Sequence, residues 1–155
     1  MSNFLTQNGL QELILELQKI DEVIIPKILE GLNEALAAGD MSENSARDGL
    51  LIDQKNIIDR RQQVEEILKN YTLIEETSLS QSKNVKIGNT VKLEFTNLKK
   101  VFTVQILGSS EADIINNKVS NEAPLIMSIL GKKIGSEIIF KNKNTTNQIK
   151  ILDIL

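Results

Sequence analysis

The sequence of 155 residues contains no cysteine and no histidine, and its aromatic residues are limited to four phenylalanines and one tyrosine. Without cysteine and histidine, the chain cannot form disulfides, Cys/His zinc sites, thiol nucleophiles or Ser/His/Asp triads. Any chemistry must therefore use carboxylates, amines, amides or hydroxyls. Binding of single-stranded nucleic acid by base stacking needs aromatic side chains, and the few present are assigned to the core.

Long apolar runs are also missing. No stretch of about 18 apolar residues predicts a transmembrane helix, and the N-terminus lacks the basic and apolar segments of a secretory signal. We therefore expect a cytoplasmic protein without a membrane partner. Hydrophobic residues make up 41% of the chain, which is enough for one globular domain or two small ones.

Charge is distributed unevenly between the two halves of the chain. Residues 1–79 contain 15 acidic and 7 basic side chains, whereas residues 80–155 contain 6 acidic and 11 basic ones. Phosphates favour lysine and arginine, so the acidic half is a poor independent binder of nucleic acid. If RNA is a target, we expect another component to hold it.

The first half of the chain has the apolar pattern of two amphipathic helices. Apolar residues recur at steps of three and four from residue 7 to residue 38, and a second stripe ends at Tyr71. Only Gly39 and Asp40 separate the stripes, which predicts an antiparallel helical hairpin over residues 7–71. Pro26 interrupts the backbone hydrogen bonding of the first helix, so a kink is expected near residues 21–23, with a break into two helices as the alternative.

A polar stretch separates the helices from a different pattern. Residues 78–84 have no periodicity and predict a linker between a domain at 1–77 and a domain at 85–155. A short helix is predicted at 124–130, from Pro124 to a stop at Gly131. The second domain is therefore expected to be a small, mainly antiparallel α+β module. Its β-type runs cover residues 85–87, 90–95, 101–107, 137–141 and 148–152.

Asp40 and Glu43 stand at the predicted turn between the two helices. Asp40 can cap the second helix, and Glu43 falls in its first turn, where acids interact favourably with the helix dipole. On physical grounds alone this capping role is the stronger interpretation. The alternative is that two carboxylates at the end of a long hairpin share a hard cation such as Mg²⁺, with other groups completing the site.

Several motifs follow one another along the chain, and in this order they resemble the GreA/GreB family of bacterial transcript-cleavage factors. The turn carries Gly39-Asp40-x-Ser42-Glu43-Asn44, which resembles the family's tip motif, and Pro26 matches a proline of its first helix. Further similar segments are Thr6-x-x-Gly9-x-x-x-Leu13, Val85-x-Ile87-Gly88-x-x-Val91, Gln105-Ile106-Leu107-Gly108, Glu111-Ala112-Asp113 and residues 124–135.

The resemblance implies an α+β fold, with the hairpin as an N-terminal coiled coil and a C-terminal domain of FKBP-like fold. It implies a monomeric transcription elongation factor that enters the secondary channel of RNA polymerase and stimulates cleavage of the 3′ end of backtracked, nascent RNA. Asp40 and Glu43 would help to hold a Mg²⁺ ion of the polymerase, which is itself the enzyme, and the chain would have no cofactor of its own. The residues that resemble the family's channel-rim docking loop are Ser120, Asn121, Glu122, Ala123 and Pro124, and the equally favoured alternative is that Pro124 only starts a helix.

The chain departs from the Gre pattern beside the two acids. Leu36-Ala37-Ala38 replace a charged stretch, Ala46-Arg47 replace an acid and an aromatic, and Leu51 replaces a basic residue. Arg47 is a candidate for contact with RNA, although pairing with acids of its own helix is the stronger interpretation. These changes leave open a second function, that of a channel-binding regulator that does not promote cleavage.

A third function, prolyl isomerase or chaperone, follows from the FKBP-like fold alone. Isomerase pockets of that fold are built from aromatic side chains, and the second domain offers only Phe95, Phe102 and Phe140. Fold analogy does not establish an activity, so this function is the least favoured of the three.

Overall fold

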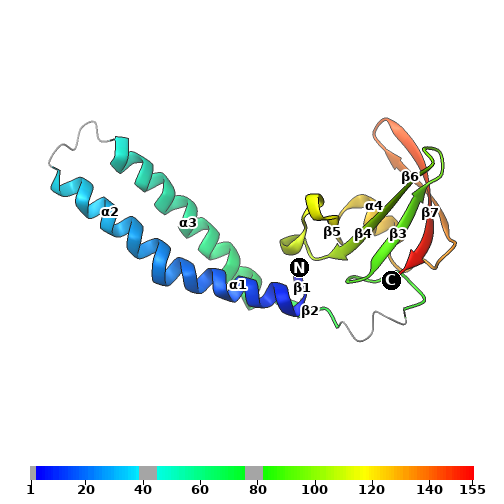
Figure 1. Cartoon of the computed structure of the whole chain (residues 1–155), viewed down its shortest axis with the longest axis horizontal. Coiled ribbons are helices and arrows are strands. Elements are labelled where there is room, and N and C mark those ends of the chain that lie inside the picture. The colour runs from blue at the N-terminus through cyan, green and yellow to red at the C-terminus, as the bar shows by residue number, and fades with distance from the viewer. Residues whose placement is uncertain (1–2, 39–44, 76–81) are drawn as a thin grey trace. The chain divides into compact units, whose positions relative to one another are not determined.

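The computed structural model describes residues 3–38, 45–75 and 82–155, which divide into two compact units (Figure 1). One unit is Leu10–Asn70, and the other joins Met1–Gly9 to Tyr71–Leu155. The second unit, called the sheet unit below, thus contains the residues on both sides of the helical segment.

Leu10–Asn70 forms the predicted helical hairpin. Its first arm comprises α1 (Gln7–Lys19), η1 (Ile20–Ile24) and α2 (Ile25–Ala37), and its second arm is α3 (Ser45–Lys69). The first three residues of α1, Gln7–Gly9, belong to the sheet unit. α2 packs against α3, and the buried side chains belong to the apolar stripes found in the sequence. They are Leu10, Leu13, Ile20, Ile28 and Val64.

The first arm changes its helical geometry where Pro26 predicts a disturbance. Ile20–Ile24 form a π-helical turn, after which the amide of Ile25 donates to the carbonyl of Ile20. Pro26 has no amide hydrogen to donate to the carbonyl of Glu22, so the regular α-helical pattern cannot pass through this position. The predicted position of the irregularity is confirmed, and its form is a widened turn.

The sheet unit is built on a five-stranded sheet with the strand order β5-β4-β3-β7-β6 (Figure 1). Neighbouring strands are antiparallel except β4 and β5, which pair in parallel, so the sheet is mixed. With the short helix α4 (Pro124–Ile129), this unit confirms the predicted α+β class. The strands are β3 (Thr90–Phe95), β4 (Lys100–Leu107), β5 (Lys118–Ser120), β6 (Glu137–Asn142) and β7 (Thr145–Ile154).

The core of the sheet unit combines side chains of the central strands with side chains of α4. After α4, Gly131 adopts a left-handed backbone with a φ of 78°. The backbone leaves the helix already at Leu130, with φ −55° and ψ 133°, and Gly131 completes a turn in which the amide of Lys132 donates to the carbonyl of Ile129 at 3.0 Å. Glycine adopts the left-handed conformation of this turn without strain, and α4 ends within two residues of the predicted stop. The core residues are Val85, Val91, Leu93, Ile106, Ile126, Ile129, Ile149 and Ile151.

The predicted strand at residues 85–87 is wrong. Asn84 makes an isolated bridge with Lys133, and the amide of Val85 donates to the carbonyl of Lys132, after which the chain turns at Gly88. Val85 is fully buried, so the apolar run marks a core segment without regular strand pairing.

The assignment of Tyr71 to the helical stripe is also wrong. α3 ends at Lys69, and Tyr71 begins β2 (Tyr71–Leu73), which pairs in parallel with β1 (Asn3–Leu5). The predicted linker at 78–84 lies largely outside the described residues, so the domain boundaries at 77 and 85 stay a prediction. In the described parts of the chain, no helix is long and apolar enough to cross a lipid bilayer.

Candidate functional site

The two acids singled out by the sequence, Asp40 and Glu43, lie outside the described residues. They belong to residues 39–44, here called the linking segment, which follow α2 and precede α3 in the chain. The hairpin thus places their neighbours in sequence at the ends of two helices. Their role as Mg²⁺ ligands stays a prediction.

Exposed apolar side chains stand close in sequence to the linking segment. Leu36, in the last turn of α2, is 48% exposed, and Leu51, in the second turn of α3, is 39% exposed. Arg47 lies in the first turn of α3 and is partly buried. Its contact with RNA stays a prediction.

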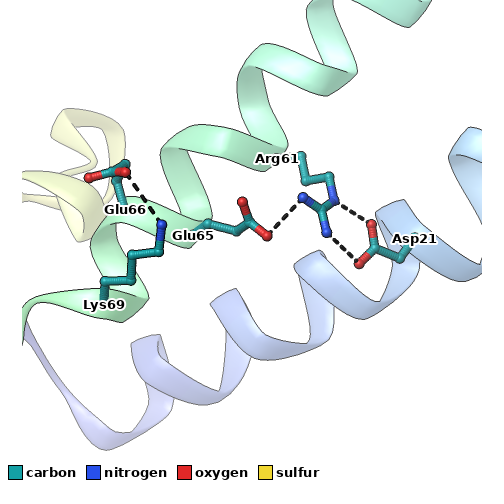
Figure 2. Close-up of polar contacts among 5 residues, drawn as sticks. All are labelled: Asp21, Arg61, Glu65, Glu66 and Lys69. Carbon is teal, nitrogen blue, oxygen red and sulfur yellow. Dashed lines mark hydrogen bonds and ion pairs between the residues drawn. The ribbon is translucent and has the colours of Figure 1, made fainter.

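Two adjacent arginines of α3 tie the arms of the hairpin together. Arg60 donates to both carboxylate oxygens of Glu16, at 2.6 and 2.9 Å. Arg61 does the same with Asp21, at 2.6 and 3.2 Å, and contacts Glu65 of its own helix at 2.7 Å (Figure 2). Such two-point pairing restricts the orientation of a guanidinium more than a single contact does.

These pairs change the ionisation of their members. The hydrogen bond from Arg61 lowers the pKa of Asp21 below its ordinary value, against the opposing effect of partial desolvation. Hydrogen bonds to Glu16 and Asp21 likewise raise the pKa values of Arg60 and Arg61. Because water and salt screen partly exposed pairs, their main effect is to favour one alignment of the arms rather than to add much stability.

Residues 120–124, the predicted docking segment, form one hydrogen-bonded turn between β5 and α4. The amide of Glu122 donates to the hydroxyl of Ser120, and the amide of Ala123 donates to the carbonyl of Ser120, both at 3.1 Å. Pro124 follows as the first residue of α4, and Glu122 and Pro124 are exposed. The structure thus brings the predicted docking residues together at the surface. Their contact with RNA polymerase stays a prediction.

Ser109, which the sequence did not single out, completes the polar contacts of the docking segment. Its hydroxyl donates to a carboxylate oxygen of Glu122 at 2.9 Å. Since Ser109 has only one hydroxyl hydrogen, the hydroxyl of Ser120 is the donor across the 2.8 Å that separate the two serine oxygens. The carboxylate of Glu122 is therefore held by a neighbouring loop. No local motif marks Ser109, because its partners lie 11 and 13 residues further along the chain.

An apolar hollow of about 320 Å³ lies on the sheet unit, lined in part by Phe95, Phe102, Ile114 and Leu125. The rings of Phe95 and Phe102 are in edge-to-face contact, with centroids 5.3 Å apart. The third phenylalanine of this domain, Phe140, packs against the core and is not among the described residues that line the hollow. None of those lining residues has a titratable side chain. The hollow can accept an apolar group, and the described residues that line it provide no acid or base for catalysis.

Comparisons with known proteins agree over both parts of the chain. Residues 3–73 match the family model described as transcription elongation factor, N-terminal, and residues 80–155 match the model described as transcription elongation factor, GreA/GreB, C-term. The crystal structure of GreA factor homolog 1 (Gfh1) of Thermus thermophilus covers 100% of this chain and 99% of its own, with 20% identity and a TM-score of 0.46.

The similarity to individual proteins extends over nearly the whole chain. Transcription elongation factor GreA of Mesoplasma florum is 37% identical over 150 residues, which cover 97% of this chain and 96% of that protein. Transcription elongation factor GreA of Clostridium acetobutylicum is 35% identical over 150 residues, which cover 97% and 94%. With both family models matched and relatives of this similarity over almost its full length, the chain belongs to the GreA/GreB family of transcription elongation factors.

Proposed function

We propose that this protein stimulates cleavage of backtracked RNA by bacterial RNA polymerase, with Asp40 and Glu43 as the acids that act at the polymerase active site. The observation that supports this most directly is the position of the motif Gly39-Asp40-x-Ser42-Glu43-Asn44 in the sequence, between α2 and α3 of a GreA/GreB family member. The protein is then an accessory factor, and the polymerase is the enzyme.

The hairpin provides the reach that this function needs. α3 has 25 residues and is therefore about 37 Å long, at about 1.5 Å per residue. A narrow pair of helices can enter a channel that a globular domain cannot. The hairpin portion also carries most of the acidic excess of residues 1–79, which suits a basic protein channel and a metal cation better than it suits bare RNA.

The two acids alone do not make a complete metal site. Mg²⁺ prefers six oxygen ligands, and the described residues hold no cluster of three or more acidic side chains that could bind an ion. We therefore propose that Asp40 and Glu43 add two carboxylates to a Mg²⁺ ion held mainly by the polymerase. Such an ion would supply charge stabilisation for hydrolysis together with a second metal of the polymerase, and the part of Asp40 and Glu43 would be to provide two of its carboxylate ligands.

The docking segment would hold the factor at the rim of the channel. Glu122 and Pro124 are exposed, and hydrogen bonds from Ser109 and within the turn restrict the carboxylate of Glu122. A preorganised surface of this kind loses less conformational entropy on binding than a flexible loop does.

The test uses purified RNA polymerase halted on a template in a backtracked state, with RNA length measured over time. We expect the protein to accelerate shortening of the RNA from its 3′ end. Asp40→Asn or Glu43→Gln should slow this by at least about 10-fold, because the loss of a group that only orients a metal ligand already costs about 10- to 100-fold. Glu34→Gln, the same chemical change at an exposed acid of α2, is the matched control and should cleave normally. Equal rates for all four proteins would refute the assigned roles.

The second candidate function is a channel-binding regulator that does not promote cleavage. Exposed Leu36 and Leu51 beside the linking segment support it, because the resemblance to the family leads us to expect charged or basic residues near these positions. The same assay separates the two functions: binding to the halted polymerase without any shortened RNA would favour the regulator.

A further inference from the structure

The first helix of the hairpin begins with a capping arrangement that is completed by a distant residue. The hydroxyl of Thr6 accepts the amide of Gly9 at 3.0 Å, as an N-cap residue does. In the usual capping box, a glutamate at the position of Gly9 would accept the amide of the N-cap residue. Here Glu111 does so instead: one of its oxygens accepts the amide of Thr6 at 2.7 Å and the other accepts the hydroxyl of Thr6 at 2.6 Å.

Gly9 provides the space that the distant carboxylate needs. A Cβ atom at Gly9 would stand 2.2 Å from a carboxylate oxygen of Glu111, far inside van der Waals contact. Gly108, three residues before Glu111, allows a second close approach, because a Cβ there would stand 2.0 Å from the carbonyl oxygen of Phe4. Glycines on both segments therefore permit the start of α1 to lie against residues 108–111.

The same short turn also holds the docking segment. Ser109 and Glu111 are the first and last residues of the 3-10 turn η3 (Ser109–Glu111). Ser109 bonds to Ser120 and Glu122, while Glu111 bonds to Thr6. Two residues of one turn thus connect the predicted docking surface to the first turn of α1, and all of these contacts lie within the sheet unit.

We infer that η3 couples docking to delivery of the acids, with Glu111 as the positioning residue; this inference rests on the proposed function. The docking segment determines where the sheet unit is held on the polymerase. The first arm continues from the Glu111 contact for 31 residues, from Gln7 to Ala37, or about 46 Å at about 1.5 Å per residue. A change of about 10° in the direction of such an arm at its start would move its far end by about 8 Å.

That displacement matters because the proposed chemistry tolerates little error. A misplacement of about 1 Å can reduce catalysis by about 100-fold. Glu111 touches neither RNA nor metal in this scheme, and it acts through the start of α1. Its loss should therefore reduce the rate of cleavage by bound factor rather than the affinity of docking.

The decisive variant is Glu111→Gln, which preserves shape but offers only one acceptor oxygen to the two hydrogen-bond donors of Thr6. We expect the factor concentration for half-maximal cleavage to stay within about twofold, and the cleavage rate at saturating factor to fall by about five- to tenfold, within the range for a misplaced catalytic group. Glu137→Gln, at an exposed acid of β6, is the matched control. Unchanged saturated rates, or a loss of affinity alone, would overturn the inference.

Two further variants separate positioning from helix stability. Gly9→Ala should displace the carboxylate of Glu111 and lower the saturated rate, although alanine favours helix more than glycine does. Thr6→Ser keeps the hydroxyl and should retain the wild-type rate, whereas Thr6→Val should behave like Glu111→Gln. If Gly9→Ala and Thr6→Val, each as a single variant, both kept the wild-type cleavage rate at saturating factor, the positioning role of the contact between Glu111 and Thr6 would be contradicted.

A measurement without cleavage distinguishes failure of the inference from failure of the proposed function. Amide hydrogen exchange should become several-fold faster over residues 6–10 in Glu111→Gln than in Glu137→Gln, while residues 120–124 keep their protection. If the wild-type protein stimulated no RNA cleavage, the proposed function would fail. The exchange comparison would still test whether Glu111 holds the start of α1. Equal exchange rates over residues 6–10 in the two variants would show that the contact between Glu111 and Thr6 does not hold the start of α1.

Discussion

The hairpin and the sheet unit are stabilised in different ways. The sheet unit gathers eight fully buried side chains in one cluster, whereas the hairpin buries few and joins its arms through partly exposed ion pairs. Two helices packed side by side cannot cover each other's outer surfaces, and Leu15 and Ile58 remain 63% and 48% exposed. The described buried core is thus larger in the unit that carries the predicted docking segment, whereas the long helices belong to the unit that carries the candidate acids.

The largest expected effect is in the sheet core. Ile151 of β7 is fully buried and lies opposite Leu93 of β3. Ile151→Ala removes buried methyl and methylene groups and leaves a cavity, so the free energy of unfolding of the sheet unit should fall by about 3 to 5 kcal/mol. Urea titration followed by hydrogen exchange of β3 and β7 measures this. A smaller loss of unfolding free energy in Ile151→Ala than in the hairpin variant Val64→Ala would contradict the contrast between the units.

A smaller effect is expected in the hairpin. Val64 of α3 is fully buried, and Val64→Ala should lower the free energy of unfolding of the hairpin by about 2 kcal/mol, since fewer carbon atoms are lost than in Ile151→Ala. Exchange of amides in α2 and α3 should accelerate, while β3 and β7 stay protected. Simultaneous acceleration in both units would show that they unfold as one.

Replacing a glycine by alanine should have opposite effects on stability in the two units. Gly49 lies within α3, and a Cβ added there would meet no other atom within 4 Å, so Gly49→Ala should stabilise the hairpin by about 0.5 to 1 kcal/mol. Gly131 has a left-handed backbone, so Gly131→Ala should destabilise the sheet unit by about 1 kcal/mol. Thermal unfolding of both variants measures the difference, and shifts of the same sign would contradict it.

The smallest effect is a pH dependence that each unit shows through one aspartate. Arg61 lowers the pKa of Asp21 in the hairpin, and the side chain of Asn116 lowers the pKa of Asp113 in the sheet unit. A carboxyl with a lowered folded-state pKa stabilises the fold above its ordinary pKa of about 4, and this contribution is lost as the pH falls through the folded-state value.

Hydrogen exchange between pH 6 and pH 3, corrected for the intrinsic rate, should detect this loss. Asp21→Asn should make the stability of the hairpin less dependent on pH and leave that of the sheet unit unchanged. Asp113→Asn should do the same for the sheet unit and leave the hairpin unchanged. An unchanged pH dependence in both variants would show that these hydrogen bonds are too weakly populated in solution to matter.

Elements with a strong local pattern were predicted well. The first arm of the hairpin was expected at 7–38 and is observed at Gln7–Ala37, and the strand expected at 90–95 is β3 (Thr90–Phe95). The helix expected at 124–130 is α4 (Pro124–Ile129). Helical and strand periods repeat every few residues, so a single sequence contains enough information to detect them.

Short elements that depend on distant partners were missed. β1, β2 and β5 have three residues each, too few for a periodic signal, and β1 finds its partner 68 residues away, where Asn3 pairs with Tyr71. The apolar run at 85–87 was read as a strand because burial and strand pairing produce the same pattern over three residues.

The sequence by itself determined the helical hairpin, most of the sheet, the family resemblance and the candidate acids Asp40 and Glu43, since each depends on local order along the chain. Only the tertiary structure decided which side chains hold these parts in place. The pairing of Arg61 with Asp21 spans 40 residues, and the cap that Glu111 gives to Thr6 spans 105. Folding brings such residues together through the packing of whole elements, and no local pattern in the sequence records the contact.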